Sequence, residues 1–164
     1  MTAQSKPIIV QPGQAQKLHA FGNILSVFLG GEQTNGILSV TSELIVPGGG
    51  PPLHVHSHED EIFLVVEGCI SYFAEERWTE VGMGGAVYLP RGAAHRYRNV
   101  GTTPGRHWII TTPSGFETFF ARSADEFAQA GGPDMDKIIA IHREHSIELL
   151  EEIYESTTHE PIAP

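Results

Sequence analysis

The chain has 164 residues, of which 40% are hydrophobic and 18% are charged, a composition typical of one globular domain and not of a disordered chain. Lys and Arg number 10 and Asp and Glu number 20, so the formal net charge is −10. Because an acidic surface repels phosphate backbones and anionic lipids, we expect neither nucleic acid nor a membrane as a partner.

The cysteine count and the start of the sequence indicate the cellular compartment. Cys69 is the single cysteine, so an intramolecular disulfide is excluded. The first residues show no basic start followed by a long apolar stretch, and no apolar run approaches the roughly 20 residues that a membrane-spanning helix needs. We therefore expect a cytoplasmic protein.

The chain from Pro7 to Pro113 has the pattern of an all-β structure. Short runs rich in Val, Ile, Phe, Thr and Tyr alternate with Gly and Pro, and such regular spacing is typical of a sandwich or barrel. We divide the chain into a leader with the first strand (1–21), a β-barrel (22–113), and a helical cap and tail (114–164). The predicted strands are Ile8–Val10, Asn23–Leu29, Ile37–Ile45, Leu53–His56, Glu61–Glu67, Cys69–Ala74, Ala86–Leu89, His95–Asn99 and His107–Thr111.

After Pro113 the pattern changes to short helices. Ser114–Glu117 and Ser123–Glu126 each fit a capping box, which marks the start of a helix. Phe116, Phe119 and Phe120 share one helical face, so we expect this face to cover the open end of the barrel. A second helix is predicted from Asp134 to about His145, with isoleucines available for packing.

Three histidines and one glutamate form the candidate metal site. His54 and His56 lie two residues apart on an extended segment, so both side chains point to the same face. A short turn brings Glu61 beside that pair on the next strand, and His95 begins a later strand. If these strands are neighbours, three imidazoles and one carboxylate converge inside the barrel.

This ligand set suits one divalent metal ion in a catalytic role. Imidazole binds Zn, Cu, Fe and Ni and carboxylate admits Mn, so the ion is one of Fe, Mn, Ni, Co, Zn and Cu. Four protein ligands on an octahedral ion leave two positions open for substrate, water or dioxygen. Open positions are typical of a catalytic site and not of a closed structural zinc site.

The residues around these ligands resemble the two motifs of the cupin superfamily. The first motif is Gly48, five residues, His54, one residue, His56, four residues, Glu61, six residues, Gly68. The second is Gly84, five residues, Pro90, one residue, Gly92, two residues, His95, three residues, Asn99. The resemblance implies a double-stranded β-helix, the cupin or jelly-roll barrel, with short C-terminal helices, in which His54, His56, Glu61 and His95 bind the metal.

A narrower resemblance suggests an activity. The stretch Pro-Pro-Leu-His-Val-His-Ser-His-Glu-Asp-Glu at 51–61 is similar to bacterial single-domain cupins related to quercetin dioxygenase, and so is Gly-Phe-Glu-Thr-Phe-Phe at 115–120. It implies an oxidoreductase, a dioxygenase that takes dioxygen and a small enol or phenolic, flavonol-like substrate, with Glu61 as general base. A metal-dependent isomerase, decarboxylase or lyase and a non-catalytic binding protein are the alternatives. The resemblance also suggests a homodimer.

Two interpretations remain open for each of three further polar residues, His58, His107 and Tyr97. His58 is either a ligand or second-layer residue or an exposed turn residue, and His107 either lines the pocket or packs within its strand. Tyr97 either donates a hydrogen bond in the pocket or fills it, whereas Asn99 is expected to fix a turn or the barrel backbone. Four further histidines are expected on the surface: His19, His142, His145 and His159.

Overall fold

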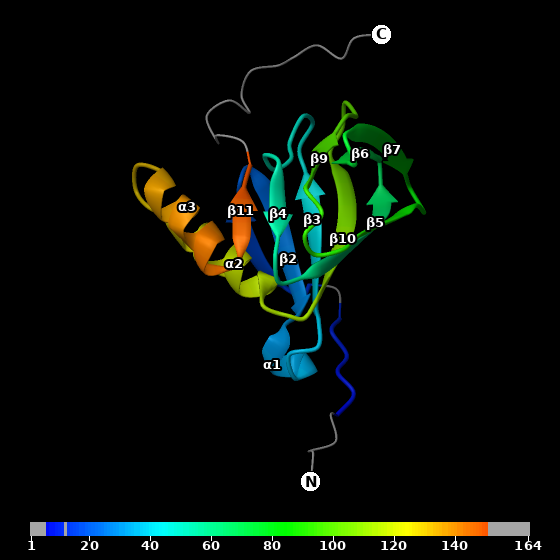
Figure 1. Ribbon diagram of the computed structural model, residues 1–164. Coiled ribbons are helices and arrows are strands. Elements are labelled where there is room, and N and C mark those ends of the chain that lie inside the picture. Colours follow the sequence, from blue (N-terminus) through cyan, green and yellow to red (C-terminus); the bar gives the residue numbers. More distant parts are fainter. Residues whose placement is uncertain (1–5, 12, 151–164) are drawn as a thin grey trace.

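Two antiparallel sheets face each other in the computed structural model of the protein, which describes residues 6–11 and 13–150 (Figure 1). The first sheet contains, in spatial order, β1 (Gln16–Ala20), β2 (Asn23–Leu29), β3 (Ser39–Ile45), β10 (Gly105–Thr112), β5 (Asp60–Glu67) and β8 (Ala86–Leu89). The second contains β11 (Ile147–Leu149), β4 (His54–His56), β9 (His95–Asn99), β6 (Cys69–Ala74) and β7 (Arg77–Gly82). The predicted all-β fold is confirmed.

Most predicted strands occur at or within two residues of their expected bounds, but the two ends of the chain differ. The segment Ile8–Val10 forms no strand, and the first strand is β1 instead. β-Branched residues favour a strand only where a neighbouring strand pairs with them, and this segment has none among the described residues. β7 and β11 were not predicted, because their residues show little hydrophobic alternation.

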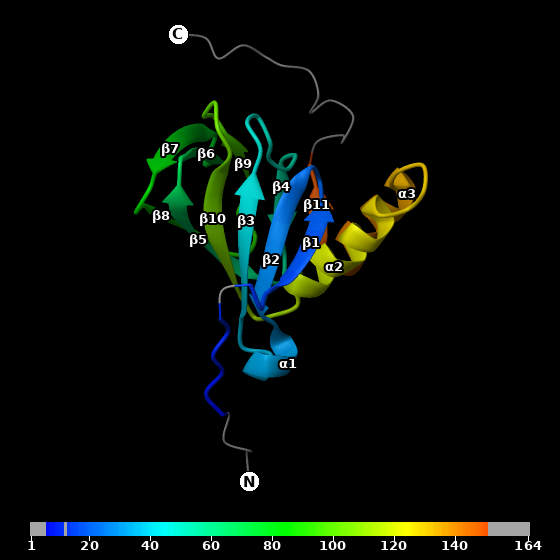
Figure 2. The same cartoon turned by 180° about the vertical axis from the view of Figure 1, so that it is seen from behind.

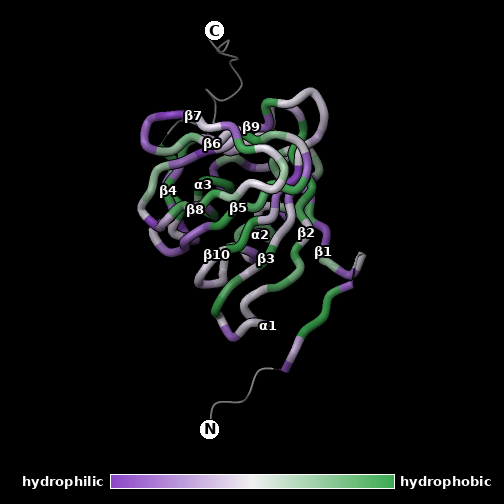
Figure 3. Tube along the Cα trace, turned by 90° about the vertical axis from the view of Figure 1, so that its right-hand side faces the viewer, coloured by the Kyte–Doolittle hydropathy of each residue, from purple (hydrophilic) through white to green (hydrophobic). Residues whose placement is uncertain are grey.

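Alternation of buried and exposed side chains explains why the central strands form a barrel. In β9 and β10 every second residue is buried, which is the period of a strand with one face in a core. Figure 3 shows the hydrophilic turn beside β7 at the rim, away from this core. The core contains Leu25, Ile45, Phe63, Val65, Ile70 and Ile109.

The two long helices, α2 (Phe116–Phe127) and α3 (Met135–Glu144), lie beside the barrel, α2 against β1 and α3 against β11 (Figures 1 and 2). The short helix α1 (Gly31–Thr34) lies in the connection between β2 and β3. Both predicted capping boxes were wrong: the N-cap of α2 is Gly115 and not Ser114, and Ser123 lies inside the same helix. The Gly115 amide donates to the Glu117 carboxylate. α3 begins next to Asp134, close to its predicted start, and the Asp134 side chain caps it by accepting from the amides of Asp136 and Lys137. Within the described residues, no helix is long and apolar enough to cross a membrane.

The loop that leads into β4 is fixed against β9. The Gly48 amide donates to the Asn99 carbonyl at 2.9 Å, and the Asn99 amide donates to the Gly49 carbonyl at 2.9 Å. The Asn99 side chain donates to the carbonyls of Ile45 and Thr103, so it fixes the backbone as expected. A Cβ atom on Gly50 would lie 1.9 Å from the Tyr97 carbonyl oxygen, so only glycine fits there.

Gly50→Ala is therefore expected to lower the free energy of unfolding by about 1–3 kcal/mol, because the loop must move away from β9. Urea denaturation measures the change. Gly82→Ala is the matched control, since a Cβ atom there meets nothing within 4 Å, and it is expected to be neutral. Equal stability of the two variants would contradict the close approach of the loop.

Candidate metal centre

Strand pairing brings the four predicted ligands together. β4 pairs with β9 through His54 and His95, and Glu61 on β5 lies across the barrel from them. All four side chains are buried, and one potential ligand atom from each of His54, His56, Glu61 and His95 lies within 4.8 Å of the others. The structure thus gathers the whole predicted set.

Neighbouring groups fix the orientation of each imidazole. The Nδ1 atoms of His54 and His95 lie 2.9 Å from the carbonyl oxygens of Pro52 and Ala93. A carbonyl oxygen only accepts, so in these two rings Nδ1 carries the hydrogen and Nε2 keeps its lone pair. This is the tautomer in which Nε2 can bind a metal.

Glu59 holds the third ring, a role that the sequence analysis missed. Its Oε2 atom lies 3.4 Å from His56 Nδ1, and its side chain is 3% exposed. The adjacent His58, considered as a ligand, is an exposed turn residue instead. The contact between Glu59 and His56 could have been predicted from the sequence, because Glu59 lies three residues after His56 in a tight turn.

Three atoms at the centre lack a hydrogen-bond partner among the described residues: His56 Nε2, Glu61 Oε2 and His95 Nε2. His95 Nε2 lies 2.7 Å from Glu61 Oε2, but because Nδ1 carries the hydrogen of this ring, Nε2 has none to donate to the carboxylate. Buried polar atoms without partners are costly, and a divalent cation bound by all of them removes that cost. The residues present therefore fit one metal ion.

The electrostatics favour the metal-binding protonation states of His54 and Glu61, whereas the carboxylates of Glu61 and Glu59 outweigh burial and raise the pKa of His56. Burial, then the neighbouring His95 and His56, lowers the pKa of His54 to about 3, so this ring is neutral near pH 7. Burial alone would raise the pKa of Glu61, but His56 and His95 outweigh it and lower this pKa to about 2. A neutral imidazole and an ionised carboxylate are the forms that bind metals.

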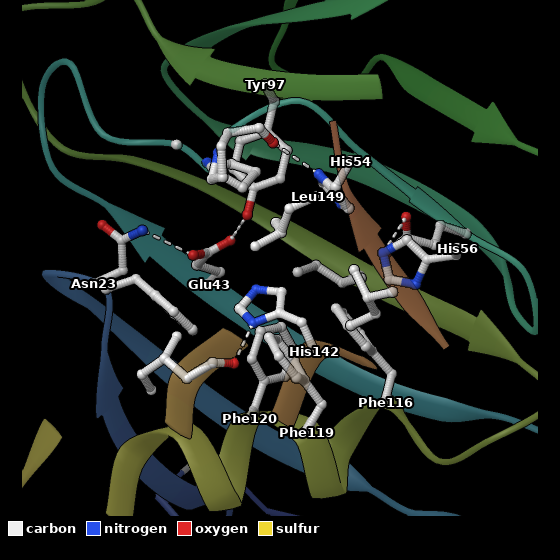
Figure 4. A pocket seen from close by; sticks show the side chains of 18 of the residues that line it. Asn23, Glu43, His54, His56, Tyr97, Phe116, Phe119, Phe120, His142 and Leu149 are labelled. Atoms are coloured by element: carbon white, nitrogen blue, oxygen red, sulfur yellow. Dashed lines mark hydrogen bonds and ion pairs between the residues drawn. The ribbon is translucent and has the colours of Figure 1, made fainter. Parts of the chain in front are cut away.

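A cavity of about 340 Å³ lies between the centre and the two long helices (Figure 4). His54, His56 and Glu61 line it on the barrel side. Much of the opposite wall is aromatic and consists of four phenylalanines of α2: Phe116, Phe119, Phe120 and Phe127. Such a concave, mainly apolar space beside a polar centre is typical of a small-molecule site.

A second polar cluster surrounds Glu43. Its carboxylate accepts hydrogen bonds from Asn23 at 2.8 Å, the Tyr97 hydroxyl at 2.5 Å and His107 Nε2 at 2.9 Å. His107 lies behind this carboxylate, fully buried and bonded to Tyr72 through Nδ1, so it packs inside the barrel and does not line the cavity. Tyr97 both lines the cavity and donates to Glu43.

The surface placement predicted for His142 was wrong. His19 is exposed and His145 is half-buried, but His142 is buried and lines the cavity, while His159 lies outside the described residues. The buried position of His142 could have been predicted from helical spacing, because this residue lies four residues after the buried Ile138.

Together the fold and the centre define a small β-barrel protein with a buried His/Glu group compatible with one metal ion. A family model described as the cupin domain matches residues 42–110, which include His54, His56, Glu61 and His95. This stretch of the chain, 42–110, is therefore a domain of the cupin superfamily.

Two curated proteins are similar in sequence. Uncharacterized protein MJ1618 of Methanocaldococcus jannaschii is 30% identical over 84 residues, which cover 51% of this chain and 67% of that protein. Mannose-1-phosphate guanylyltransferase of Sinorhizobium fredii is 26% identical over 111 residues, which cover 54% of this chain and 22% of that enzyme. The chain thus matches only about a fifth of the guanylyltransferase.

Solved structures share the double-stranded β-helix. KdgF from Halomonas sp. has a TM-score of 0.62 at 14% identity, over 69% of this chain and 99% of that one. A predicted oxalate decarboxylase from Thermotoga maritima has a TM-score of 0.59 at 17% identity, over 65% and 99%. The polyketide cyclase RemF from Streptomyces resistomycificus has a TM-score of 0.57 at 22% identity, over 66% and 81%. At these identities the likeness shows the fold alone.

Glu59→Ala is expected to weaken Zn(II) binding about 10- to 100-fold, because His56 loses the carboxylate that orients its ring. Competition with a chromophoric chelator measures the affinity. Glu67→Ala is the control, since Glu67 is an exposed carboxylate that pairs with Arg106 on the surface. Wild-type affinity in Glu59→Ala would contradict the role of Glu59.

Proposed function

We propose that His54, His56, Glu61 and His95 bind one divalent metal ion and that the protein is a metal-dependent dioxygenase of a small enol or phenolic, flavonol-like compound. The observation that carries the proposal is the juxtaposition of three unpaired ligand atoms with an aromatic-walled cavity. When bound, the metal would supply Lewis acidity and, in its redox-active forms, a means of activating dioxygen. The phenylalanine wall suits a flat aromatic substrate.

The chain's own residues would orient the substrate and accept its proton. Glu61 lines the cavity and is also one of the four residues of the metal centre. A substrate hydroxyl that enters the cavity therefore meets an ionised carboxylate, which accepts its proton. Phe116 contacts the His56 ring with centroids 4.9 Å apart. The aromatic wall thus reaches the centre and limits the access of water to it.

Oxygen uptake with a flavonol tests this proposal on protein reconstituted separately with Fe(II), Mn(II), Ni(II) and Co(II). Uptake is expected with at least one metal and is expected to be lost in His54→Ala, which removes one ligand. Glu61→Ala is also expected to abolish turnover, and retained activity with metal still bound would contradict its role as base. Glu80→Ala, an exposed change on β7, serves as the control.

The same assay separates the alternatives. Turnover under strict anaerobiosis would replace the dioxygenase with an isomerase, decarboxylase or lyase at the same centre. No uptake at full metal occupancy would set flavonol oxygenation aside, and tight binding without product would favour a non-catalytic binding protein. The cytoplasmic location stays a prediction from the sequence.

We also propose that the protein forms a homodimer in which an apolar N-terminal segment contacts the second copy. Pro7–Val10 lies outside the barrel, where Figure 3 shows it as a hydrophobic stretch, and the Ile9 side chain is 79% exposed. Exposed apolar residues are a feature that a second copy can cover.

Sedimentation velocity at micromolar concentration is expected to give the mass of a dimer. Ile9→Asp is expected to shift the protein toward the monomer, whereas Ile37→Asp, a change at another exposed isoleucine, is expected to leave the dimer intact. A monomeric wild-type protein would contradict the dimer, and a dimeric Ile9→Asp variant would contradict the role of the segment.

A further inference from the structure

His142 brings a polar side chain into the cavity from the helix side. It lies on α3, lines the cavity and is 8% exposed. Its Nδ1 atom lies 2.7 Å from the Ile138 carbonyl oxygen one turn earlier. Because that oxygen only accepts, Nδ1 carries the hydrogen and Nε2 is left with a lone pair.

Aromatic packing around His142 fixes the orientation of its ring. The ring meets Phe119 edge-on, with centroids 4.7 Å apart, and meets Phe21 in the same manner at 6.1 Å. Burial lowers the pKa of His142, so the ring is neutral near pH 7. No hydrogen bond to Nε2 is found in the part of the chain that the structure describes, so its lone pair can accept a donor from a molecule in the cavity.

A second acceptor points into the same space. Figure 4 shows the Glu43 carboxylate and the His142 ring both directed into the pocket. The three hydrogen bonds that Glu43 accepts come from Asn23, Tyr97 and His107. A carboxylate has about four acceptor positions, so Glu43 can still take one donor from a ligand.

We propose that His142 Nε2, with the Glu43 carboxylate beside the same space, forms an acceptor subsite for a hydroxyl group of the substrate. The inference deepens the proposed function and rests on the use of this cavity as the substrate site. The substrate would be an aromatic molecule with two polar groups, an oxygen that faces the metal centre and a hydroxyl that donates to this subsite. Such a subsite selects against analogues that lack the hydroxyl, because they leave buried acceptors unpaired.

Phenol and toluene test the subsite, because they have nearly the same shape and differ in one donor. A purely apolar cavity prefers toluene, since phenol must give up the hydration of its hydroxyl. Titration of the full chain loaded with redox-inert Zn(II) is expected to show phenol binding about fivefold more tightly than toluene. Tighter binding of toluene would overturn the proposal.

Matched variants assign the preference to its residues. His142→Phe keeps an aromatic ring against Phe119 and loses the acceptor, so toluene is expected to bind more tightly than phenol. His145→Phe, a change near the end of the same helix but outside the cavity, is expected to keep the preference for phenol. Glu43→Gln is expected to reduce that preference, and an unchanged preference would remove Glu43 from the subsite. A persistent preference in His142→Phe would mean that phenol binds the metal or another group.

A second measurement needs no variant. The ¹⁵N resonance of His142 Nε2 in the wild-type protein is expected to shift with phenol and not with toluene, and equal behaviour with both would overturn the proposal. Neither measurement uses dioxygen or turnover. Failure of the dioxygenase proposal therefore leaves this result standing, and the reverse also holds.

Discussion

The burial of three imidazoles and one carboxylate inside a narrow barrel is the constraint on which the rest of the site depends. Polar groups in a protein interior are costly unless they are paired, so each ring must engage its outer nitrogen. The partners are the Pro52 and Ala93 carbonyls and the Glu59 carboxylate, each within three residues of the ring that it holds. The turns that shape the barrel thus also fix the tautomers. They leave the inner nitrogens of His56 and His95 close to the Glu61 carboxylate, where a cation would complete the set.

The cluster around Glu43 shows that residue types alone do not define such a centre. It also combines a buried carboxylate with an imidazole, yet His107 is bonded through both nitrogens, to Glu43 and to Tyr72. Since each His107 nitrogen has a partner, this cluster gives no reason to place a metal there. The unpaired atoms, and not the histidines themselves, distinguish the candidate metal centre.

Much of this centre could be predicted from the sequence because its geometry depends on short-range rules. Two histidines two residues apart must share a face of a strand, and fixed spacing to Glu61 and His95 sets the remaining ligands. The pairing of weakly patterned segments could not be predicted, since β7 and β11 are strands only because β6 and β4 offer partners. Conversely, Ile8–Val10 has the composition of a strand and no partner among the described residues.

The barrel and the helices contribute different parts of the cavity. The barrel supplies the four centre residues, all within the stretch that the cupin model matches, 42–110. The helices that follow supply the aromatic wall and His142, and Glu117 at the start of α2 ties them to the barrel side by accepting from the Gly31 amide. Fold and centre can therefore be shared among proteins of different activity while the covering segment differs. Under the proposed function, the choice of substrate accordingly depends on the face that α2 and α3 present to the cavity.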